Sequence, residues 1–485
     1  MKEAVFSSRP FRHLVLWGSL FTVGFMQRSV AEPSAPALTS AVVLEINEFA
    51  VAASGPPEIT CKEALDKTGP VEKPVTAKNP IRKVKKPDVN EMESVSIAGS
   101  QEAWQPIDPM QLPVQPLEGR TADVAAVGAI LNRADAGESI RISFFGDSHT
   151  SAEWFTGHLR RKLQAQYGDR GHGFILPAAL YKWYRGSDIN LCRTEGWRSD
   201  YAGKRDSRKD GLLGFGGMSV SSSNPDDFGW VQTTVSNPQG RKVSVFNVYT
   251  LNQPDGGTFF AQVDEAEPVA VSTVGAKEGL SLTRLKVPDG PHRLVLSPKG
   301  DGEVRIFGVS LERESPGVIL DAMGINGRQA FHSLEWQDQL MFPGIQSLQP
   351  DLVVLQYGTN EANDSELELS KYREQLIAVI ARFKKAAPNA ACLLVGPTDR
   401  AVKKDEGIYA IWDRTAPIAD VQRSVASETG CAFWDWQKAS GGEGSILSWR
   451  FHEPRLASKD LIHLSRKGYE LSAEQLLKAI QNAKK

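Results

Sequence analysis

The sequence predicts an α/β protein with a parallel β-sheet, into which an all-β sandwich is inserted. Two observations lead to this fold class. From about residue 120 onward, short apolar strands alternate with amphipathic helices, which is the pattern of a parallel sheet covered on both faces. Between residues 186 and 313 that alternation gives way to β-branched and aromatic runs separated by regular turns, which is typical of a sandwich.

The size and composition are those of a globular protein with more than one folded unit. The 485 residues, 41% of them hydrophobic, exceed the roughly 100–200 residues of one domain. Lys plus Arg number 56 and Asp plus Glu 58, a net charge of −2, so the chain lacks the basic excess that nucleic-acid binding requires. Nucleic acid is therefore not an expected partner.

The cysteines and the potential metal ligands give no sign of a metal site. The four cysteines have no CxxC spacing, which argues against structural zinc and leaves one disulfide open; they are Cys61, Cys192, Cys392 and Cys431. Carboxylates and histidines do not gather at metal-ligand spacing either. We expect neither a metal nor another cofactor.

Residues 1–31 have the pattern of a secretory signal peptide. Lys2, Arg9 and Arg12 precede a thirteen-residue apolar run at 14–26, and small residues follow at Ser29 and Ala31. The run is shorter than the roughly 20 residues of a membrane-spanning helix. We therefore expect a protein exported to the periplasm or cell envelope and, after cleavage, not integral to the membrane. An uncleaved amino-terminal anchor is the alternative.

Residues 32–100 are predicted to be a mostly disordered linker. The segment is rich in Pro, Ala, Lys and Glu and has few large apolar residues, too few to offset the entropy of ordering the chain. The apolar stretch 41–51 is the exception and is expected to form a short element.

The α/β part is expected in two pieces, residues 101–185 and 314–485. Its strands are predicted at residues 140–145, 318–322, 352–356, 392–395 and 432–435. Apolar residues at helical spacing predict helices on Phe155, Leu159, Leu163 and Tyr167, on Leu369, Tyr372, Leu376, Ile380 and Phe383, and on Tyr469, Ala473, Leu476, Leu477 and Ile480. Ser365 and Glu368 have the spacing of a capping box for the second of these helices.

Residues 186–313 form the predicted sandwich. Strand-like runs at 242–250, 282–287 and 294–297 are each followed by a turn rich in Gly, Asp or Pro. Its aromatic residues could stack on sugars, but a sandwich core also needs aromatics and we favour that role for them. They are Trp197, Trp230, Tyr249 and Phe259.

A serine stands where open α/β sheets bind their ligands. Ser148, within the sequence GDSHT at 146–150, follows a predicted strand and opens a helix. The positive end of a helix and a backbone amide can stabilise an oxyanion there. The competing interpretation is that Asp147 or Ser148 is an ordinary helix cap.

Asp460 and His463 precede the last helix and supply what a nucleophilic serine needs. Imidazole has a pKa near neutrality, and a carboxylate on its other nitrogen fixes the tautomer. An isolated pair of this kind is more often a cap beside a surface histidine. Its coexistence with Ser148 gives it weight.

Two further turns complete the set of candidates. Asn360 follows the predicted strand at 352–356, and its amide is a good donor to an oxyanion. Gly324 and Gly327 follow the strand at 318–322, and a glycine allows close approach of a backbone N–H. Singly these are turn sequences; together they lie beyond different strands of one sheet.

In this order the blocks GDS, GING, GTNE and DLIH resemble those of SGNH (GDSL-type) hydrolases. The resemblance implies a flavodoxin-like three-layer fold, with Ser148 as nucleophile, His463 as general base and acid, and Asp460 as its orienting carboxylate. It also implies an oxyanion hole of the Ser148 and Gly327 amides and the Asn360 side chain. His149 departs from the leucine common after GDS, Glu361 from a common Asp, and Gly324 competes with Gly327.

Residues 146–174, 395–400 and 433–449 are similar to exported peptidoglycan O-acetylesterases, which carry a β-sandwich like a carbohydrate-binding module between the serine and glycine blocks. This resemblance implies an envelope esterase that removes O-acetyl groups from a polysaccharide, peptidoglycan in particular, through an acetyl-enzyme on Ser148. Two alternatives stay open. One is a polysaccharide O-acyltransferase with the same triad, and the other is a glycan-binding protein without catalysis.

Overall fold

The computed structural model describes residues 38–45, 61, 95–99, 104–178, 181, 184, 186–234 and 237–484. The predicted signal peptide at 1–31 lies outside the described residues, as does most of the predicted linker at 32–100. Those two assignments stay predictions. No helix in the described ranges is long and apolar enough to cross a membrane.

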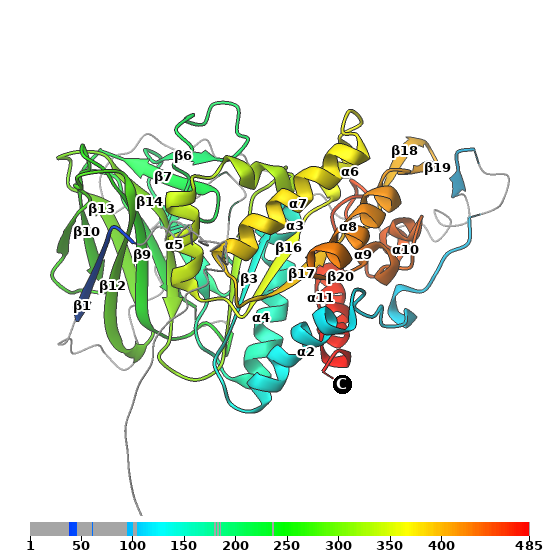
Figure 1. Cartoon of the computed structure of the whole chain (residues 1–485), viewed down its shortest axis with the longest axis horizontal. Helices are drawn as coiled ribbons and strands as arrows, with labels where there is room; N and C mark the ends of the chain where they lie inside the picture. Colours follow the sequence, from blue (N-terminus) through cyan, green and yellow to red (C-terminus); the bar gives the residue numbers. More distant parts are fainter. Residues whose placement is uncertain are drawn as a thin grey trace, which may run out of the picture. The chain divides into compact units, whose positions relative to one another are not determined.

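A five-stranded, fully parallel sheet forms the centre of the α/β part (Figure 1). Its strands are β3 (Ile140–Gly146), β15 (Val318–Gly324), β16 (Leu352–Gln356), β17 (Ala391–Val395) and β20 (Ala432–Trp434). Each lies within two residues of a predicted strand. The parallel sheet predicted from the sequence is confirmed.

The strand order is β15-β3-β16-β17-β20. In chain order this is 2-1-3-4-5, the flavodoxin-like arrangement, so the predicted fold is confirmed. The order reverses between β3 and β16, which are direct neighbours in register from Leu352 opposite Ile142 to Gln356 opposite Gly146. Open α/β sheets bind ligands at such a switch point, and Ser148 and Asn360 follow these two strands.

Helices cover both faces of the sheet because its side chains alternate. Leu352 and Val354 pack in the core with α2 (Thr121–Asp135), α4 (Trp154–Tyr167) and α11 (Arg466–Asn482). Val353 and Leu355 pack in the core with α5 (Asp338–Leu348), α7 (Leu369–Ala386) and α8 (Thr415–Thr429). Period-two alternation thus produces the three layers.

Shorter elements connect or extend these layers. They are η2 (Pro109–Gln111), α3 (Ser148–Ser151), η3 (Ala330–Glu335), α6 (Thr359–Asn363), α9 (Trp436–Ala439) and α10 (Ser445–Phe451). A small sheet joins β18 (Ala401–Asp405) and β19 (Ile408–Ile411) to β2 (Ser96–Ile97).

The predicted capping box of α7 is wrong. The helix begins at Leu369, and its N-cap Glu368 makes no capping hydrogen bond with its side chain. Asp364 instead organises the preceding turn, where its backbone oxygen accepts from the N–H of Leu367 at 3.2 Å and its Oδ1 from that of Glu366 at 3.2 Å. Ser365 lies in that turn, so it has no helix to cap.

The β-rich region consists of two sheets (Figure 1). One has the order β1-β12-β9-β14-β7-β6, with β4 also paired to β14, and the other β11-β10-β13-β8-β5. Their bounds are β1 (Ser40–Glu45), β4 (Gly173–Ile175), β5 (Ile189–Arg193), β6 (Arg198–Tyr201), β7 (Met218–Ser222), β8 (Gly229–Thr233), β9 (Val243–Asn252), β10 (Thr258–Val263), β11 (Val269–Ser272), β12 (Gly279–Gly290), β13 (Arg293–Pro298) and β14 (Val304–Glu312).

The four aromatic residues weighed as sugar-stacking candidates are all buried, from Phe259 at 0% exposure to Trp197 at 6%. Trp197, Tyr249 and Phe259 belong to the hydrophobic core that the β region shares, which is the role favoured from the sequence. The exact limits of the insert, 186–313, stay a prediction.

A buried ion-pair network fastens this β region to the parallel sheet. Arg141 on β3 donates from Nε to Asp321 of β15 at 2.9 Å and from Nη2 to Glu312 of β14 at 2.8 Å. Burial alone would raise the pKa of Glu312, but Arg141 holds it down at about 2. Breaking one partner of such a buried pair costs about 3–5 kcal/mol, so the junction is strongly fixed.

Two disulfides are formed, Cys61–Cys192 and Cys392–Cys431. The first joins Cys61 to β5, and the second joins β17 to the residue before β20. The sequence left open a single disulfide. The short element expected at 41–51 is present in its described part as β1, which extends β12 in parallel from Ser40 opposite Ser281.

Candidate active site

Ser148 lies at the carboxyl end of β3, where the strand turns directly into α3. Asp147 is the N-cap of α3, and its Oδ1 accepts from the N–H of His149 at 2.9 Å. The preceding Gly146 is required by space, because a Cβ there would lie 2.1 Å from Thr150 Oγ1 and 2.7 Å from the Gln356 carbonyl. Asp147 is thus the predicted cap, while Ser148 is left free for another partner.

Ser148, His463 and Asp460 form one hydrogen-bonded chain. Ser148 Oγ lies 2.8 Å from His463 Nε2, and His463 Nδ1 lies 2.8 Å from Asp460 Oδ2. A carboxylate can only accept, so Nδ1 carries the proton and Nε2 is left as the acceptor for the serine hydroxyl. This is the arrangement that a serine nucleophile requires.

The turn that carries Asp460 and His463 is held by its own backbone. Asp460 Oδ1 accepts from the N–H groups of Ile462 and His463, both at 3.0 Å. Between them Leu461 has the left-handed φ of 57°, a conformation unusual for a bulky side chain. Its side chain is buried, which compensates for the strain and keeps the two functional groups on one side.

The pKa values of this pair move in opposite directions. Partial burial would raise the pKa of Asp460, but the hydrogen bonds from His463 and the two backbone N–H groups lower it to about 2. The hydrogen bond to Asp460 raises the pKa of His463 above its usual value, against the effect of partial burial. Asp460 is therefore ionised wherever His463 is neutral.

Asn360 lies at the first turn of α6, beyond β16. Its Nδ2 donates to the Arg328 carbonyl at 2.9 Å and lies 3.5 Å from Asp147 Oδ2. The first contact ties Asn360 to the turn after β15, and the second is at the limit of a hydrogen bond. One amide hydrogen of Asn360 is thus weakly held beside Asp147, the residue that precedes Ser148.

The structure separates the roles of the two candidate glycines. Gly324 is buried at the end of β15, and a Cβ there would lie 2.3 Å from Ser151 N, so it permits close packing against α3. Gly327 is exposed, has φ 72° and lies in a turn closed by Arg328 N donating to Ile325 O at 3.3 Å. Among the described residues, the N–H of Gly327 has no hydrogen-bond partner.

His149 is a site residue whose importance the sequence did not reveal. His149 is buried next to His463, and the centres of the two rings are 5.2 Å apart. Its Nδ1 lies 2.8 Å from the hydroxyl of Tyr469. Burial, and then the nearby charge of His463, lower its pKa well below the usual value, so the ring is neutral. His149 and Tyr469 are 320 residues apart in the sequence, so no sequence pattern predicts their contact.

Glu361 also has a structural role that the sequence did not show. One carboxylate oxygen accepts from Ala330 N at 2.7 Å and the other from Gly358 N at 3.0 Å. Burial raises its pKa to about 7, as it does that of Asp147. Glu361 thus connects the start of α6, which carries Asn360, to η3, which follows the Gly327 turn.

Comparisons with known proteins agree with this geometry. Residues 297–471 match the model of the GDSL-like lipase/acylhydrolase family. A solved structure of a peptidoglycan O-acetylesterase is 25% identical, with a TM-score of 0.63 over 76% of this chain and 99% of that chain. No curated protein matches the sequence.

Two further solved structures are more distant. An acetyl xylan esterase, AlAXEase, is 21% identical with a TM-score of 0.25 over 33% of this chain and 80% of that chain. A family two carbohydrate esterase from Cellvibrio japonicus is 11% identical with a TM-score of 0.24 over 61% of this chain and 99% of that chain. With the family match, the parallel sheet and the inserted β region, the chain is a carboxylic ester hydrolase that carries an SGNH (GDSL-type) domain.

Proposed function

We propose that this protein removes O-acetyl groups from a polysaccharide of the cell envelope, peptidoglycan, through an acetyl-enzyme on Ser148. The observation that carries the proposal is the hydrogen-bonded chain from Ser148 through His463 to Asp460, with 2.8 Å at both links. Two contacts support the proposed oxyanion hole: Asn360 Nδ2 lies 3.5 Å from Oδ2 of Asp147, the residue before Ser148, and Asn326 in the Gly327 turn accepts a hydrogen bond from Ser151 of α3. The proposed steps use the side chains and backbone of this chain together with water.

In the first half of the reaction, Ser148 Oγ attacks the carbonyl carbon of the acetyl ester. Its proton passes to His463 Nε2, and Asp460 stabilises the imidazolium that forms. The negative charge on the carbonyl oxygen is stabilised by the N–H groups of Ser148 and Gly327 and by Asn360 Nδ2. When the C–O bond to the sugar breaks, the proton on Nε2 goes to the sugar oxygen.

In the second half, water attacks the acetyl-serine carbonyl and gives its proton to His463 Nε2. The second tetrahedral intermediate uses the same oxyanion hole. Collapse of that intermediate returns the proton to Ser148 Oγ and releases acetate. The neutral His149 behind His463 leaves the imidazolium as the single cationic ring of the pair, because its own protonation is suppressed by burial.

The choice of substrate rests on two observations. A solved structure that is 25% identical, with a TM-score of 0.63, is a peptidoglycan O-acetylesterase, and residues 1–31 have the pattern of an export signal. Together they support an acetylated glycan of the envelope as the substrate and the periplasm or another exported location as the site of action.

The test is acetate release from O-acetylated peptidoglycan by the full chain, beside Ser148→Ala and beside a small aryl acetate. We expect the wild-type protein to release acetate from both substrates and the variant from neither. Serine-dependent cleavage of the aryl acetate alone would keep the esterase chemistry and reject peptidoglycan. Turnover by Ser148→Ala at the wild-type rate would reject the nucleophile.

A further inference from the structure

A pocket of about 390 Å³ opens in the loop between β6 and β7 of the inserted region. Of the twelve residues that line it, four are cationic and one is acidic. The cations are Lys204, Arg205, Arg208 and Lys209, and the acid is Glu335. The pocket is therefore electropositive, although the whole chain has a net charge of −2.

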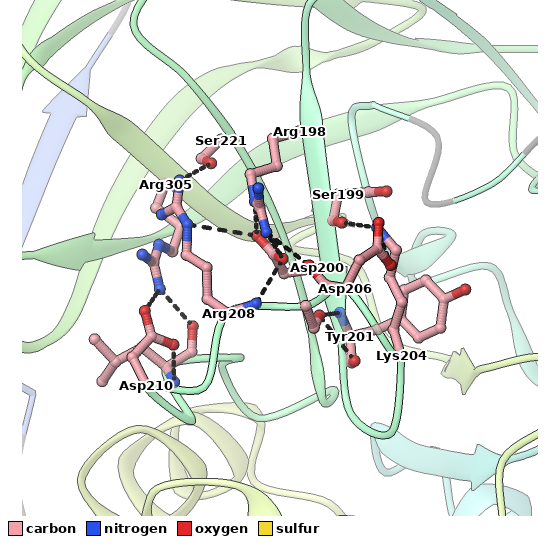
Figure 2. Close-up of polar contacts among 12 residues, drawn as sticks. Arg198, Ser199, Asp200, Tyr201, Lys204, Asp206, Arg208, Asp210, Ser221 and Arg305 are labelled. Atoms are coloured by element: carbon pink, nitrogen blue, oxygen red, sulfur yellow. Dashed lines mark hydrogen bonds and ion pairs between the residues drawn. The ribbon is translucent and has the colours of Figure 1, made fainter.

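The wall of this pocket is held in shape by ion pairs (Figure 2). Asp200, whose side chain is 2% exposed, pairs with Arg198 at 2.9 Å and accepts from the Arg208 backbone N–H at 3.0 Å. The Arg208 guanidinium pairs with Glu303 of the sandwich. These contacts pair the charges of Arg198 and Arg208 with carboxylates of the protein and fix the loop that follows β6.

Arg205 and Lys209 take no part in these ion pairs. Both are exposed, both line the pocket, and neither forms an ion pair or a side-chain hydrogen bond with any residue that the structure describes. Their backbone is set by the braced loop, so two uncompensated cations are presented at a fixed place. Such an arrangement fits an anionic ligand group.

Arg328 connects the pocket to the Gly327 turn. Its Nη1 donates to the Ala202 carbonyl at 3.2 Å, and its guanidinium lies 5.6 Å from the centre of the Tyr201 ring. The carbonyl of the same Arg328 accepts from Asn360 Nδ2 at 2.9 Å. One residue therefore joins two residues of the pocket wall to the amide that faces the reacting oxygen.

We propose that this pocket is a subsite that binds a carboxylate of the acylated glycan through Arg205 and Lys209 while the acetyl ester lies at Ser148. The inference rests on the proposed function, since it concerns the same substrate. Peptidoglycan offers carboxylates on its stem peptides and, where the peptide is removed, on the lactyl ether of the muramic acid. Both sources present the same chemistry to the pocket.

The test compares Arg205→Gln/Lys209→Gln with wild type and with the control pair Lys385→Gln/Lys478→Gln. The control pair removes the same charge near the ends of α7 and α11, helices that run away from the edge of the sheet where Ser148 lies. The measured quantity is the ratio of kcat/KM on O-acetylated peptidoglycan to kcat/KM on an aryl acetate. Binding of the same pairs to peptidoglycan is measured by sedimentation in a Ser148→Ala background.

We expect the ratio and the binding constant to fall about 3- to 30-fold in the pocket variant, as for two exposed ion pairs, and to stay within about two-fold in the control. On peptidoglycan whose carboxylates have been amidated, the difference from wild type should disappear. If it also disappears after an amidase has removed the stem peptides, the carboxylate is on the peptide; if it persists, the pocket binds the lactyl carboxylate that the amidase exposes.

Equal losses in the pocket and control variants, or a loss that survives amidation, would overturn the subsite. Failure of the proposed function is a separate outcome, because the wild-type protein would then release no acetate from peptidoglycan while still cleaving the aryl acetate.

Discussion

Replacing Asp460 by Asn should damage the enzyme more than replacing it by Ala, although Asn is the closer mimic. The reason is the number of donors that face the Asp460 side chain. One oxygen accepts from two backbone N–H groups at 3.0 Å, and the other accepts from His463 Nδ1 at 2.8 Å. An Asn side chain has one oxygen, and two N–H bonds outweigh one, so its oxygen should stay with the backbone.

The NH2 group of the introduced amide would then face His463 Nδ1. That nitrogen must become an acceptor, which moves the ring proton to Nε2 and leaves nothing to accept the proton of Ser148. In Asp460→Ala, water can take the place of the carboxylate at Nδ1, because the His463 and Asp460 side chains are 38% and 47% exposed. The productive tautomer survives in the Ala variant.

The cost in the Ala variant follows from the lost charge. Two unit charges at the 2.8 Å separation of this pair attract by about 1.5 kcal/mol in water and about 6 kcal/mol at an effective dielectric constant near 20. Since both side chains are more than a third exposed, the lower part of the range applies, about 2–3 kcal/mol. The expected loss of kcat/KM is about 30- to 150-fold.

The assay is kcat/KM on an aryl acetate between about pH 5 and 9 for wild type and both variants. Asp460→Asn should lie at least about ten-fold below Asp460→Ala, toward the roughly 10⁴-fold loss that a wrong tautomer can cause. The acid limb of Asp460→Ala should move to lower pH, because the group that raises the pKa of His463 is gone. Asn at or above Ala in activity, or an acid limb that does not move, would refute the reasoning.

Three further predictions follow from the same region. Asn360→Ala should lower kcat on the aryl acetate by about 10²–10³ with little change in KM; an unchanged kcat would remove Asn360 from the oxyanion hole. In wild type, kcat/KM should fall as the pH drops through a value above the ordinary imidazole pKa of about 6.5, because the pKa of His463 is raised; a midpoint below pH 6 in a pH–rate profile would contradict this. Paired Cys392→Ala and Cys431→Ala substitutions open a disulfide between residues 39 apart and should cost about 3–4 kcal/mol in urea unfolding, whereas an unchanged midpoint would show that the bond adds nothing.

The fold was predictable because its information is local. Alternating apolar residues such as those of 352–356 identify a strand wherever they occur, and the spacing of Tyr372, Leu376 and Ile380 identifies a helix. The site was predictable for a related reason: the carboxyl ends of parallel strands meet at one edge, so blocks that follow strands converge there. The sequence therefore predicts that Ser148 and Asn360 lie at the same edge of the sheet.

What the sequence could not show are contacts between distant residues with no periodic signature. Arg141 and Glu312 are in contact only because β14 ends beside β3. The residues that flank each of them in the sequence contain no pattern that predicts this ion pair. His149 and Tyr469 are likewise 320 residues apart. A capping box depends on the residue at which the helix begins. Ser365 lies in a turn organised by Asp364, and α7 begins only at Leu369. The disulfide Cys61–Cys192 joins β5 to a cysteine within the segment predicted as linker, 131 residues away in the sequence.

Two residues connect the inserted region to the elements that carry Ser148 and Asn360. Arg141 on β3, the strand that precedes Ser148, pairs with Glu312 at the end of β14. Arg328 hydrogen-bonds both to the β6–β7 loop and to Asn360. A shift of that loop would move the Arg328 backbone and, with it, the acceptor that orients the Asn360 amide. The proposed carboxylate subsite and the proposed oxyanion donor share Arg328, so we expect losses at the pocket to appear partly in kcat on the glycan as well as in KM.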